Sequence, residues 1–345
     1  MQTVLITGGS GFFGQILIAK LLEREYQCVN IDLVPSELNH PRLESYRGDI
    51  RNTDLLKEIF EKYQFRAIFH CAAILAHGHN NQELLWSSNV QGTRNIAEFA
   101  RKYEVKNLVF TSSNCLWGHG FKQLVTEDEP PEPVEIYGKS KWEGEKILQE
   151  YRDHVNSVII RCPTIIDYGR LGLLTILFEF IDEGRKVWLV GNGSNKYQFI
   201  YAGDLVDACI KGINHHQTDV FNIGSDYVRS FNTVYEYVID QAQTGAEIAH
   251  FPNRIIKMGM KLAYILGLSP LGPYQYKMIS ENFVFDTRKI KESLNWSPTV
   301  TNEEMLYRAY RYYREHLEEI KNRKDVSAHR SAAKMGVIKL LKWIS

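Results

Sequence analysis

Length, composition and charge exclude several classes of protein. The 345 residues include 41 lysines and arginines and 41 aspartates and glutamates, so the formal net charge is zero and no basic surface for nucleic acid is indicated. The chain is long enough to bury one large core and a smaller lobe. We expect no signal peptide, because the first apolar run begins at residue 3.

Cysteine usage indicates a reducing compartment. The five cysteines, at positions 28, 71, 115, 162 and 209, stand singly in or beside apolar runs and lack the spacing of metal ligands. They are typical of reduced core thiols. The sequence therefore predicts a cytoplasmic protein without a metal site.

The first predicted elements are a strand, a glycine-rich turn and a helix. Residues 3–7 (TVLIT) form an apolar run typical of a buried strand, and residues 15–25 offer an apolar face for a helix. Gly8, Gly11 and Gly14 lie on the turn between them. Because glycine has no Cβ, this turn would let a pyrophosphate approach the free N–H groups of the helix N-terminus. We therefore predict a dinucleotide-binding turn.

Acidic residues follow the next two predicted strands. Residues 28–32 (CVNID) form a second strand that ends in Asp32, eighteen positions after Gly14. A carboxylate there accepts hydrogen bonds from a ribose diol and repels a 2′-phosphate, which favours NAD over NADP. Asp49 follows a third short strand, and it is either a contact to the adenine or an acid of a surface turn.

Strands and helices continue to alternate along the first half of the chain. Further strands are predicted at residues 67–71, 107–111 and 157–161, and helices at residues 81–103 and 137–151. Near-continuous apolar strands of this kind are typical of a parallel sheet covered on both faces. We predict an α/β fold, namely a Rossmann-type doubly wound parallel sheet with a smaller C-terminal substrate-binding lobe.

The alternation loosens after residue 162, which suggests a boundary between two domains. We expect an NAD-binding domain at residues 1–165 and an interleaved substrate-binding lobe at residues 166–320. Strands near residues 197–201 and 220–223 are expected to return to the NAD-binding domain.

The C-terminal segment, residues 321–345, has a composition of its own. Residues 321–333 are polar and basic, as in a flexible tether, whereas residues 334–345 have the pattern of a basic amphipathic helix. Such a helix would lie either in a membrane interface or on a protein surface. Peripheral membrane contact through residues 334–345 is therefore one of two equal expectations.

A serine, a tyrosine and a lysine indicate catalysis. Tyr137 and Lys141 are four positions apart, so they share one face of the predicted helix. Ser112 and Ser113 directly follow the strand predicted at residues 107–111, upstream of that helix. This order and spacing predicts the Ser-Tyr-Lys proton relay of a nicotinamide enzyme.

Eight segments carry a resemblance to a known family. They are TGGSGFFG at 7–14, Asp32, GDI at 48–50, HCAA at 70–73, NVQGTRN at 89–95, TSS at 111–113, YGKSK at 137–141 and FIYAGDLVDA at 199–208. The chain resembles the extended short-chain dehydrogenases/reductases of the NAD-dependent epimerase/dehydratase family over roughly residues 1–315.

The resemblance implies roles for individual residues. Tyr137 would be the acid/base, Ser113 would hold the substrate oxygen, and Ser112 would contact the nicotinamide side. Lys141 would lower the pKa of Tyr137 and bind the nicotinamide ribose. The implied cofactor is NAD, and the residues implied to bind it are Gly8, Gly11, Phe12, Phe13, Gly14, Asp32, Asp49, Ile50, Ala72, Ser112, Tyr137, Lys141 and Pro163.

Departures from the family pattern narrow the reaction. In the 4,6-dehydratases of the family an Asp-Glu pair follows the serine or threonine, but here Asn114 and Cys115 stand there. Neither side chain can perform carboxylate chemistry, which argues against a dehydratase. Cys115 resembles the cysteine of GDP-fucose synthase, yet residues 163–177 contain no histidine to act with it. A small packing residue is the favoured interpretation of Cys115.

Other departures concern the substrate. Sugar-nucleotide enzymes of the family carry an Arg-Asp pair whose arginine clamps the diphosphate, but here the pair is Tyr197-Gln198, preceded by Lys196. Thr164 likewise replaces the family asparagine after Arg161. Related enzymes without the Arg-Asp pair include enzymes that handle lipidic substrates. We expect substrate contacts from Asn114, Thr164, Lys196 and Tyr197.

These observations predict an NAD-dependent epimerase of a sugar linked to a nucleotide or polyprenyl diphosphate, acting by transient hydride abstraction with Tyr137 as base. One alternative is an NAD-dependent dehydrogenase or reductase of a 3β-hydroxysteroid-like or other lipidic alcohol. Another is a non-catalytic NAD-sensing protein, because folds are reused for new functions. By analogy with relatives we expect a homodimer that pairs through the helices at residues 81–103 and 137–151.

Overall fold

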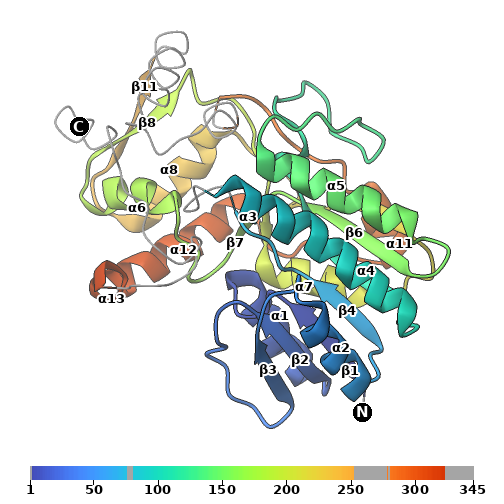
Figure 1. The fold of residues 1–345 in the computed structure, drawn as a ribbon. Coiled ribbons are helices and arrows are strands. Elements are labelled where there is room, and N and C mark those ends of the chain that lie inside the picture. Colours follow the sequence, from blue (N-terminus) through green and yellow to red (C-terminus); the bar gives the residue numbers. More distant parts are fainter. Residues whose placement is uncertain (1, 76–80, 252–277, 279, 323–345) are drawn as a thin grey trace.

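The computed structural model describes residues 2–75, 81–251, 278 and 280–322 (Figure 1). Its strands are β1 (Thr3–Thr7), β2 (Gln27–Asp32), β3 (Leu43–Arg47), β4 (Ala67–His70), β5 (Asn107–Ser113), β6 (Asn156–Cys162), β7 (Thr164–Ile166), β8 (Lys186–Val190), β9 (Phe199–Tyr201), β10 (Asp219–Asn222) and β11 (Glu247–Phe251). Its α-helices are α1 (Phe12–Glu23), α2 (Thr53–Lys62), α3 (Gln82–Trp86), α4 (Gly92–Lys102), α5 (Ile136–Glu150), α6 (Leu174–Asp182), α7 (Ala202–Gly212), α8 (Phe231–Ala242), α11 (Arg288–Leu294), α12 (Asn302–Glu315) and α13 (Leu317–Asn322).

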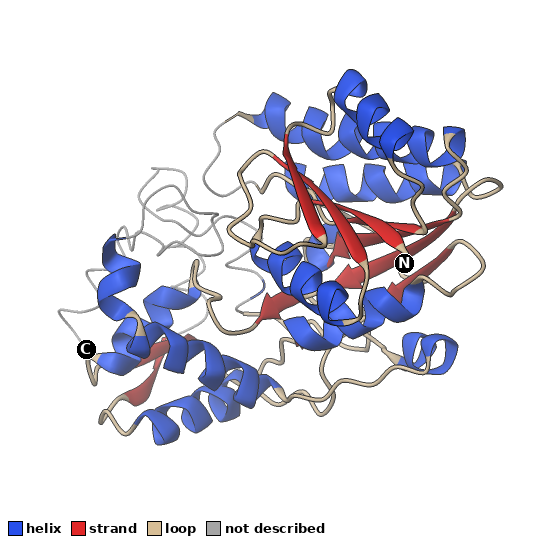
Figure 2. Ribbon diagram, turned by 90° about the horizontal axis from the view of Figure 1, so that it is seen from below, coloured by secondary structure: helices blue, strands red, loops and turns tan. Residues whose placement is uncertain are grey.

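A seven-stranded parallel sheet is the centre of the fold. Its strand order is β10-β6-β5-β4-β1-β2-β3, which confirms the predicted Rossmann-type sheet. Helices cover both faces, as Figure 2 shows. One face packs against α2, α4 and α5, and the other against α1, α7 and α11. Burial on both faces explains why these strands are apolar throughout rather than alternating.

The register of the sheet sets the position of the site. Thr7 of β1 pairs with His70 of β4, and Ser113 of β5 pairs with Cys162 of β6. Because all seven strands are parallel, their carboxyl ends lie along one edge. In open α/β sheets the ligand binds at that edge.

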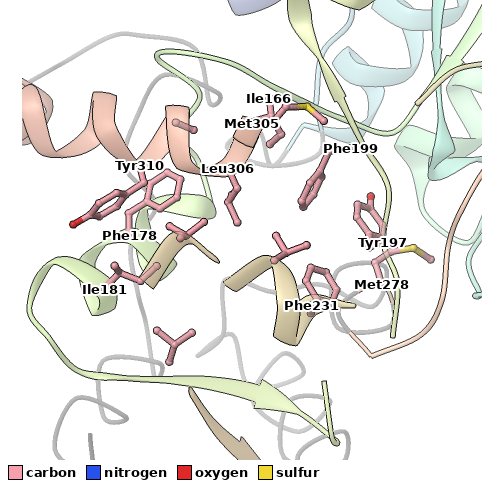
Figure 3. Packing of buried hydrophobic residues seen from close by; sticks show 14 of the residues in the cluster. Ile166, Phe178, Ile181, Tyr197, Phe199, Phe231, Met278, Met305, Leu306 and Tyr310 are labelled. Atoms are coloured by element: carbon pink, nitrogen blue, oxygen red, sulfur yellow. The ribbon is translucent and has the colours of Figure 1, made fainter. Parts of the chain in front are cut away.

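A second hydrophobic core fills the smaller lobe. It is formed by α6, α8 and α12 together with β9, and Figure 3 shows its packing. The ring of Phe178 on α6 meets that of Tyr310 on α12 edge-on, with centroids 5.9 Å apart. The strands β8 and β11 form a separate two-stranded parallel sheet in this lobe.

The strands expected to return to the central sheet behave differently from each other. The segment near 220–223 is β10, and it forms the outer edge of the sheet beside β6. The segment near 197–201 is β9, and it pairs with β7 instead. Pro163 separates β6 from β7, and β7 no longer belongs to the central sheet. The strand β9 pairs with β7 in a separate two-stranded sheet. Its side chains divide between two cores, because Phe199 packs in the smaller lobe and Ile200 in the core of the central sheet.

The helix predicted at residues 81–103 is interrupted. A π-helical turn, Ser87–Gln91, separates α3 from α4 and buries Asn89. The amide of Asn89 bonds both backbone groups of Ile74: its Oδ1 accepts from the N–H at 2.7 Å and its Nδ2 donates to the carbonyl at 3.0 Å. The Nδ2 also donates to the Ser140 hydroxyl of α5 at 3.0 Å. Asn89 in this π-helical turn therefore ties the start of α4 to α5 and to the loop after β4.

No helix within the described ranges is long and apolar enough to cross a membrane. The predicted C-terminal tether and amphipathic helix lie outside the described residues, apart from the last two residues of α13.

Candidate active site

The glycine-rich turn joins β1 to α1 in a very confined space. Gly8 has a φ of +75°, in the left-handed region, and its N–H donates to the carbonyl of Ile31 at 2.9 Å. A Cβ on Gly8 would lie 2.6 Å from the backbone nitrogen of Ala72, and a Cβ on Gly14 would overlap the carbonyl oxygen of Gly8. Glycine is therefore needed for the turn itself.

Gly11 has a different environment from the other two glycines. It precedes α1, and a Cβ there would meet the Gly8 carbonyl oxygen at 3.3 Å. The described residues thus leave the front of the helix N-terminus open, as binding of a pyrophosphate requires. Phe12 and Phe13, the first residues of α1, are buried behind it. This cradle fits NAD.

Asp32 ends β2 beside this turn. Its Oδ2 accepts from the Ser10 N–H at 2.9 Å and its Oδ1 from the Val34 N–H at 3.1 Å. Burial raises the pKa of the Asp32 carboxyl above its ordinary value, while these backbone bonds act in the opposite direction. A contact between this carboxylate and the adenosine ribose of a dinucleotide stays a prediction.

Asp49 and Ile50 follow β3. Both carboxylate oxygens of Asp49 accept from Arg51, with distances of 2.6 to 3.0 Å, and these bonds hold the pKa of Asp49 below its ordinary value. Ile50 is buried against the position of Gly92 on α4. A contact between Asp49 and the adenine stays a prediction.

The Ser-Tyr-Lys group lies where β5 ends and α5 begins. A Cβ on Gly138 would overlap the carbonyl oxygen of Cys115, so α5 starts in direct contact with the turn after β5. This approach brings the phenol of Tyr137 beside Ser113, whose side chain acts to lower the pKa of Tyr137. Ser113 Oγ also accepts from the Cys115 N–H at 3.1 Å. The three predicted catalytic side chains are therefore gathered at the carboxyl edge of the sheet.

Lys141 is deeply buried one helical turn after Tyr137. It is 2% exposed, and its Nζ lies 4.1 Å from the centroid of the Phe110 ring. Burial lowers the pKa of Lys141 to about 8, although nearby thiols and Glu145 act to raise it.

The sequence predicts that Lys141 lowers the pKa of Tyr137, but Lys141 is not among the groups that set this pKa in the structure. Burial raises the pKa of Tyr137 above its ordinary value. The cation that lowers this pKa is Arg170, and the hydrogen bond with Ser113 lowers it further. In the protein without cofactor, desolvation of the phenol outweighs the charges around it.

Three of the four predicted substrate residues meet at one point. Asn114 Nδ2 donates to the Tyr197 hydroxyl at 2.7 Å, and the Thr164 hydroxyl lies 3.2 Å from the same oxygen. Within the described part of the chain Lys196 makes no hydrogen bond to these three residues, and its side chain is exposed. Gln198 supports the neighbouring backbone instead, donating from Nε2 to the Ser225 carbonyl at 2.7 Å.

Two functional candidates were missed by sequence reasoning. Arg170 lies after β7 with its guanidinium 5.9 Å from the centroid of the Phe12 ring, and its charge acts on both Tyr137 and Tyr197. No family motif or periodic pattern marks this arginine. Glu145 is buried on α5, and it accepts from the Ser112 hydroxyl at 2.5 Å. Its position four residues after Lys141 was the available signal.

His70 has a structural environment. Its Nδ1 lies 2.6 Å from the Thr7 hydroxyl and its Nε2 2.9 Å from the Thr93 hydroxyl. Burial lowers the pKa of His70 to about 3, so the imidazole is neutral. In the part of the chain that the structure describes, no three His, Cys, Asp or Glu side chains are grouped so that they could hold a metal ion.

The fold and its glycine-rich turn together define a dinucleotide-dependent enzyme. The sequence profile of the NAD dependent epimerase/dehydratase family matches residues 4–224, and the chain belongs to this family. Its cofactor is accordingly NAD.

Individual relatives include enzymes with different reactions. The chain is 30% identical to N-acetyl-α-D-glucosaminyl-diphospho-ditrans,octacis-undecaprenol 4-epimerase of Escherichia coli O157:H7, over 81% of this chain and 80% of that protein. It is 27% identical to mouse sterol-4α-carboxylate 3-dehydrogenase, decarboxylating, over 88% of each chain. The crystal structure of UDP-glucose 4-epimerase with UDP-glucose from Thermotoga maritima superimposes with a TM-score of 0.74 and 24% identity, covering 92% of this chain and 100% of that one.

Proposed function

We propose that this protein is an NAD-dependent sugar epimerase. The observation that carries the proposal is the grouping of Ser113, Tyr137 and Lys141 with Asn114 and Cys115 next to them. The group can move the proton of one substrate hydroxyl, but Asn114 and Cys115, which follow Ser113, cannot supply the carboxylate chemistry for the loss of water. Oxidation and reduction at a single carbon is the chemistry that such a set supports.

Each catalytic residue has one task in this mechanism. Ser113 holds the substrate oxygen beside the phenol of Tyr137, and Tyr137 removes the hydroxyl proton and later returns it. NAD⁺, held by the glycine-rich turn and Asp32, would supply the hydride acceptor and a positive charge. A positive charge beside the phenol of Tyr137 would favour the tyrosinate and oppose the desolvation that raises the pKa of Tyr137 in the free protein.

The substrate proposed is a sugar carried on a diphosphate, with a polyprenyl carrier favoured over a nucleotide. Tyr197 stands in place of the arginine of the Arg-Asp pair, and its hydroxyl is bonded by Asn114. Arg170 provides positive charge near Tyr137 and Tyr197 from another direction. The similarity to the undecaprenol 4-epimerase supports this choice.

A panel of substrates tests the proposal. Purified protein is incubated with NAD⁺ and UDP-sugars, polyprenyl-linked sugars or 3β-hydroxysteroids, with absorbance followed at the NADH band and the products analysed. The expected result is conversion of one sugar to its epimer without net NADH, lost in Tyr137→Phe by about 10²–10⁴-fold. If no compound of the panel is turned over although NAD⁺ still binds, the proposed epimerase is contradicted and the NAD-sensing alternative is favoured.

A dehydrogenase acting on a lipidic alcohol is the second candidate. Tyr197 and Gln198 favour it, because neither carries the charge that clamps a diphosphate, and Gln198 is committed to the Ser225 and Phe285 backbone groups. The similarity to the mouse sterol dehydrogenase also supports it. In the same panel, NADH accumulating in step with a ketone would select this candidate over the epimerase.

Two proposals concern assembly and location. The helices α4 and α5 pack side by side on one face of the molecule (Figure 1), and we expect a homodimer through them. Light scattering that gives the mass of one chain would contradict this. Peripheral membrane contact through residues 334–345 predicts that the full chain binds anionic vesicles and that a chain lacking these residues does not.

A further inference from the structure

A buried ion pair adjoins Ser112 and Lys141, next to the proposed catalytic group. Arg161 of β6 donates from Nε to Glu145 Oε1 at 3.1 Å and from Nη2 to Oε2 at 2.8 Å. The two side chains are only 4% and 2% exposed. A buried pair of this kind contributes little net stability, because desolvation offsets most of the attraction. Its location calls for another explanation.

Both partners of the pair hold elements that carry the catalytic group. Ser112 precedes Ser113, and its hydroxyl donates to Glu145 Oε1 at 2.5 Å. Arg161 pairs with Ser112 in the register of β5 and β6, and its Nη1 donates to the Glu127 carbonyl at 2.9 Å. Glu145 thus connects the end of β5 to the helix that carries Lys141.

Glu145 also faces Lys141 along α5. The residues are four positions apart, so their side chains lie on one face of the helix. The carboxylate favours the charged form of the buried ammonium. Three thiols also raise the pKa of Lys141, namely those of Cys71 after β4, Cys115 after β5 and Cys162 of β6. The charge of Lys141 in turn lowers the pKa of His70 on β4. Glu145 is the carboxylate in this set.

We propose that Glu145, held by Arg161, is a positioning residue that keeps Lys141 protonated and fixes the Ser112–Ser113 strand end. This inference rests on the proposed function, since it assumes that charged Lys141 binds the ribose of the cofactor. Glu145 itself need not touch substrate or cofactor.

The pH dependence of NAD⁺ binding separates this role from a merely structural one. Affinity is measured by titration calorimetry between about pH 6 and pH 10. In the wild type it should fall with a midpoint near the pKa of Lys141, about 8, because the ammonium is lost above it. In Glu145→Gln the midpoint should move down by about one pH unit, because the opposite charge is gone.

Control variants make the result specific. Glu143→Gln alters an acid on the same helix that pairs with Lys146, and it should keep the wild-type midpoint. Lys141→Met should give a flat profile. Because Glu145→Gln leaves Arg161 buried without its counter-ion and can unfold, the double variant Glu145→Gln/Arg161→Met is measured too. It should fold and show the lowered midpoint.

The outcomes are decisive without a substrate. A wild-type midpoint in the double variant would overturn the inference, since it would show that the pair only supports the fold. A flat wild-type profile would also overturn it, since Lys141 would then not hold the cofactor by its charge. If the midpoint shifts as expected but no sugar or alcohol is turned over in the panel, this inference stands and the proposed function fails.

Discussion

The amide of Asn114 donates to the hydroxyl of Tyr197 at 2.7 Å, joining residues that are 83 positions apart in the sequence. Asn114 follows directly after the catalytic strand end, whereas Tyr197 precedes β9 at the junction with the smaller lobe. Both side chains are largely buried. This hydrogen bond therefore links the residues that follow β5, where the proposed catalytic serine lies, to the start of the smaller lobe.

Removal of that hydroxyl should affect substrate binding more than cofactor binding. In Tyr197→Phe the Asn114 amide loses its acceptor, and we expect the substrate KM to rise about tenfold, as the loss of one buried hydrogen bond predicts. The Kd for NAD⁺ should not change. Tyr235→Phe is the matched control, because Tyr235 packs against Phe231 in the same lobe. An unchanged KM would show that Tyr197 does not face the substrate.

The two glycines Gly14 and Gly11 should respond differently to alanine. A Cβ on Gly14 would overlap the Gly8 carbonyl and lie 2.6 Å from the Gly9 Cα, so α1 must shift. We expect Gly14→Ala to lower the free energy of unfolding by about 1–3 kcal/mol. In Gly11→Ala the loss should be about 1 kcal/mol or less, while NAD⁺ affinity falls. Urea unfolding without cofactor measures the stability of each variant, and calorimetry measures its affinity for NAD⁺. Equal stabilities of Gly14→Ala and Gly11→Ala would contradict the close contacts described at Gly14.

The charge of Asp32 should set the preference between NAD⁺ and NADP⁺. Asp32→Asn keeps an oxygen that can accept from the Ser10 N–H, but it removes the charge that repels a 2′-phosphate. The ratio of the two dissociation constants should narrow by about tenfold or more. Titration with both cofactors measures it, with Asp54→Asn on α2 as a control acid. A ratio that stays at its wild-type value would place the adenosine ribose elsewhere.

His70 should make the stability depend on pH in the acid range. Its pKa is lowered to about 3 in the folded protein, mainly by burial and also by the charge of Lys141, whereas an unfolded histidine has a pKa of about 6.5. The unfolded chain therefore takes up the proton first, so this contribution is fully present above pH 6.5 and is lost as the pH falls towards 3. The slope is about 1.4 kcal/mol per pH unit.

The variant His70→Asn isolates this effect. Between about pH 6.5 and pH 4.5 the wild type should lose about 2–3 kcal/mol more than the variant, measured by urea unfolding. His154→Asn, which alters an exposed histidine, should follow the wild type. Parallel curves for wild type and His70→Asn would mean that His70 can be protonated in the folded state.

Local patterns in the sequence were sufficient for the sheet. The β1 strand, the glycine-rich turn and Asp32 lie within 30 positions of one another, and apolar runs mark β4, β5 and β6 directly. The pairing of β9 with β7 was not predictable in this way, because either partner strand has only three residues. Their pairing depends on where the chain turns after Pro163, which no periodic pattern records.

The electrostatics of the site were the least predictable part. Spacing places Lys141 on the same helix face as Tyr137, but it does not reveal how deeply both are buried. Burial is what raises the pKa of Tyr137 and lowers that of Lys141. The sequence does not predict a role for Arg170 for a similar reason, since only the folded chain brings Arg170 beside Phe12.

The π-helical turn at Ser87–Gln91 makes the length of this segment part of the fold. Deleting one of its residues would close it to an ordinary α-helix and rotate α3 against α4 by about 100°. Asn89 could then no longer reach Ile74 and Ser140 together. Insertions and deletions should therefore be tolerated in the surface loops of this enzyme but not between Asn81 and Lys102, where the number of residues matters as much as their identity.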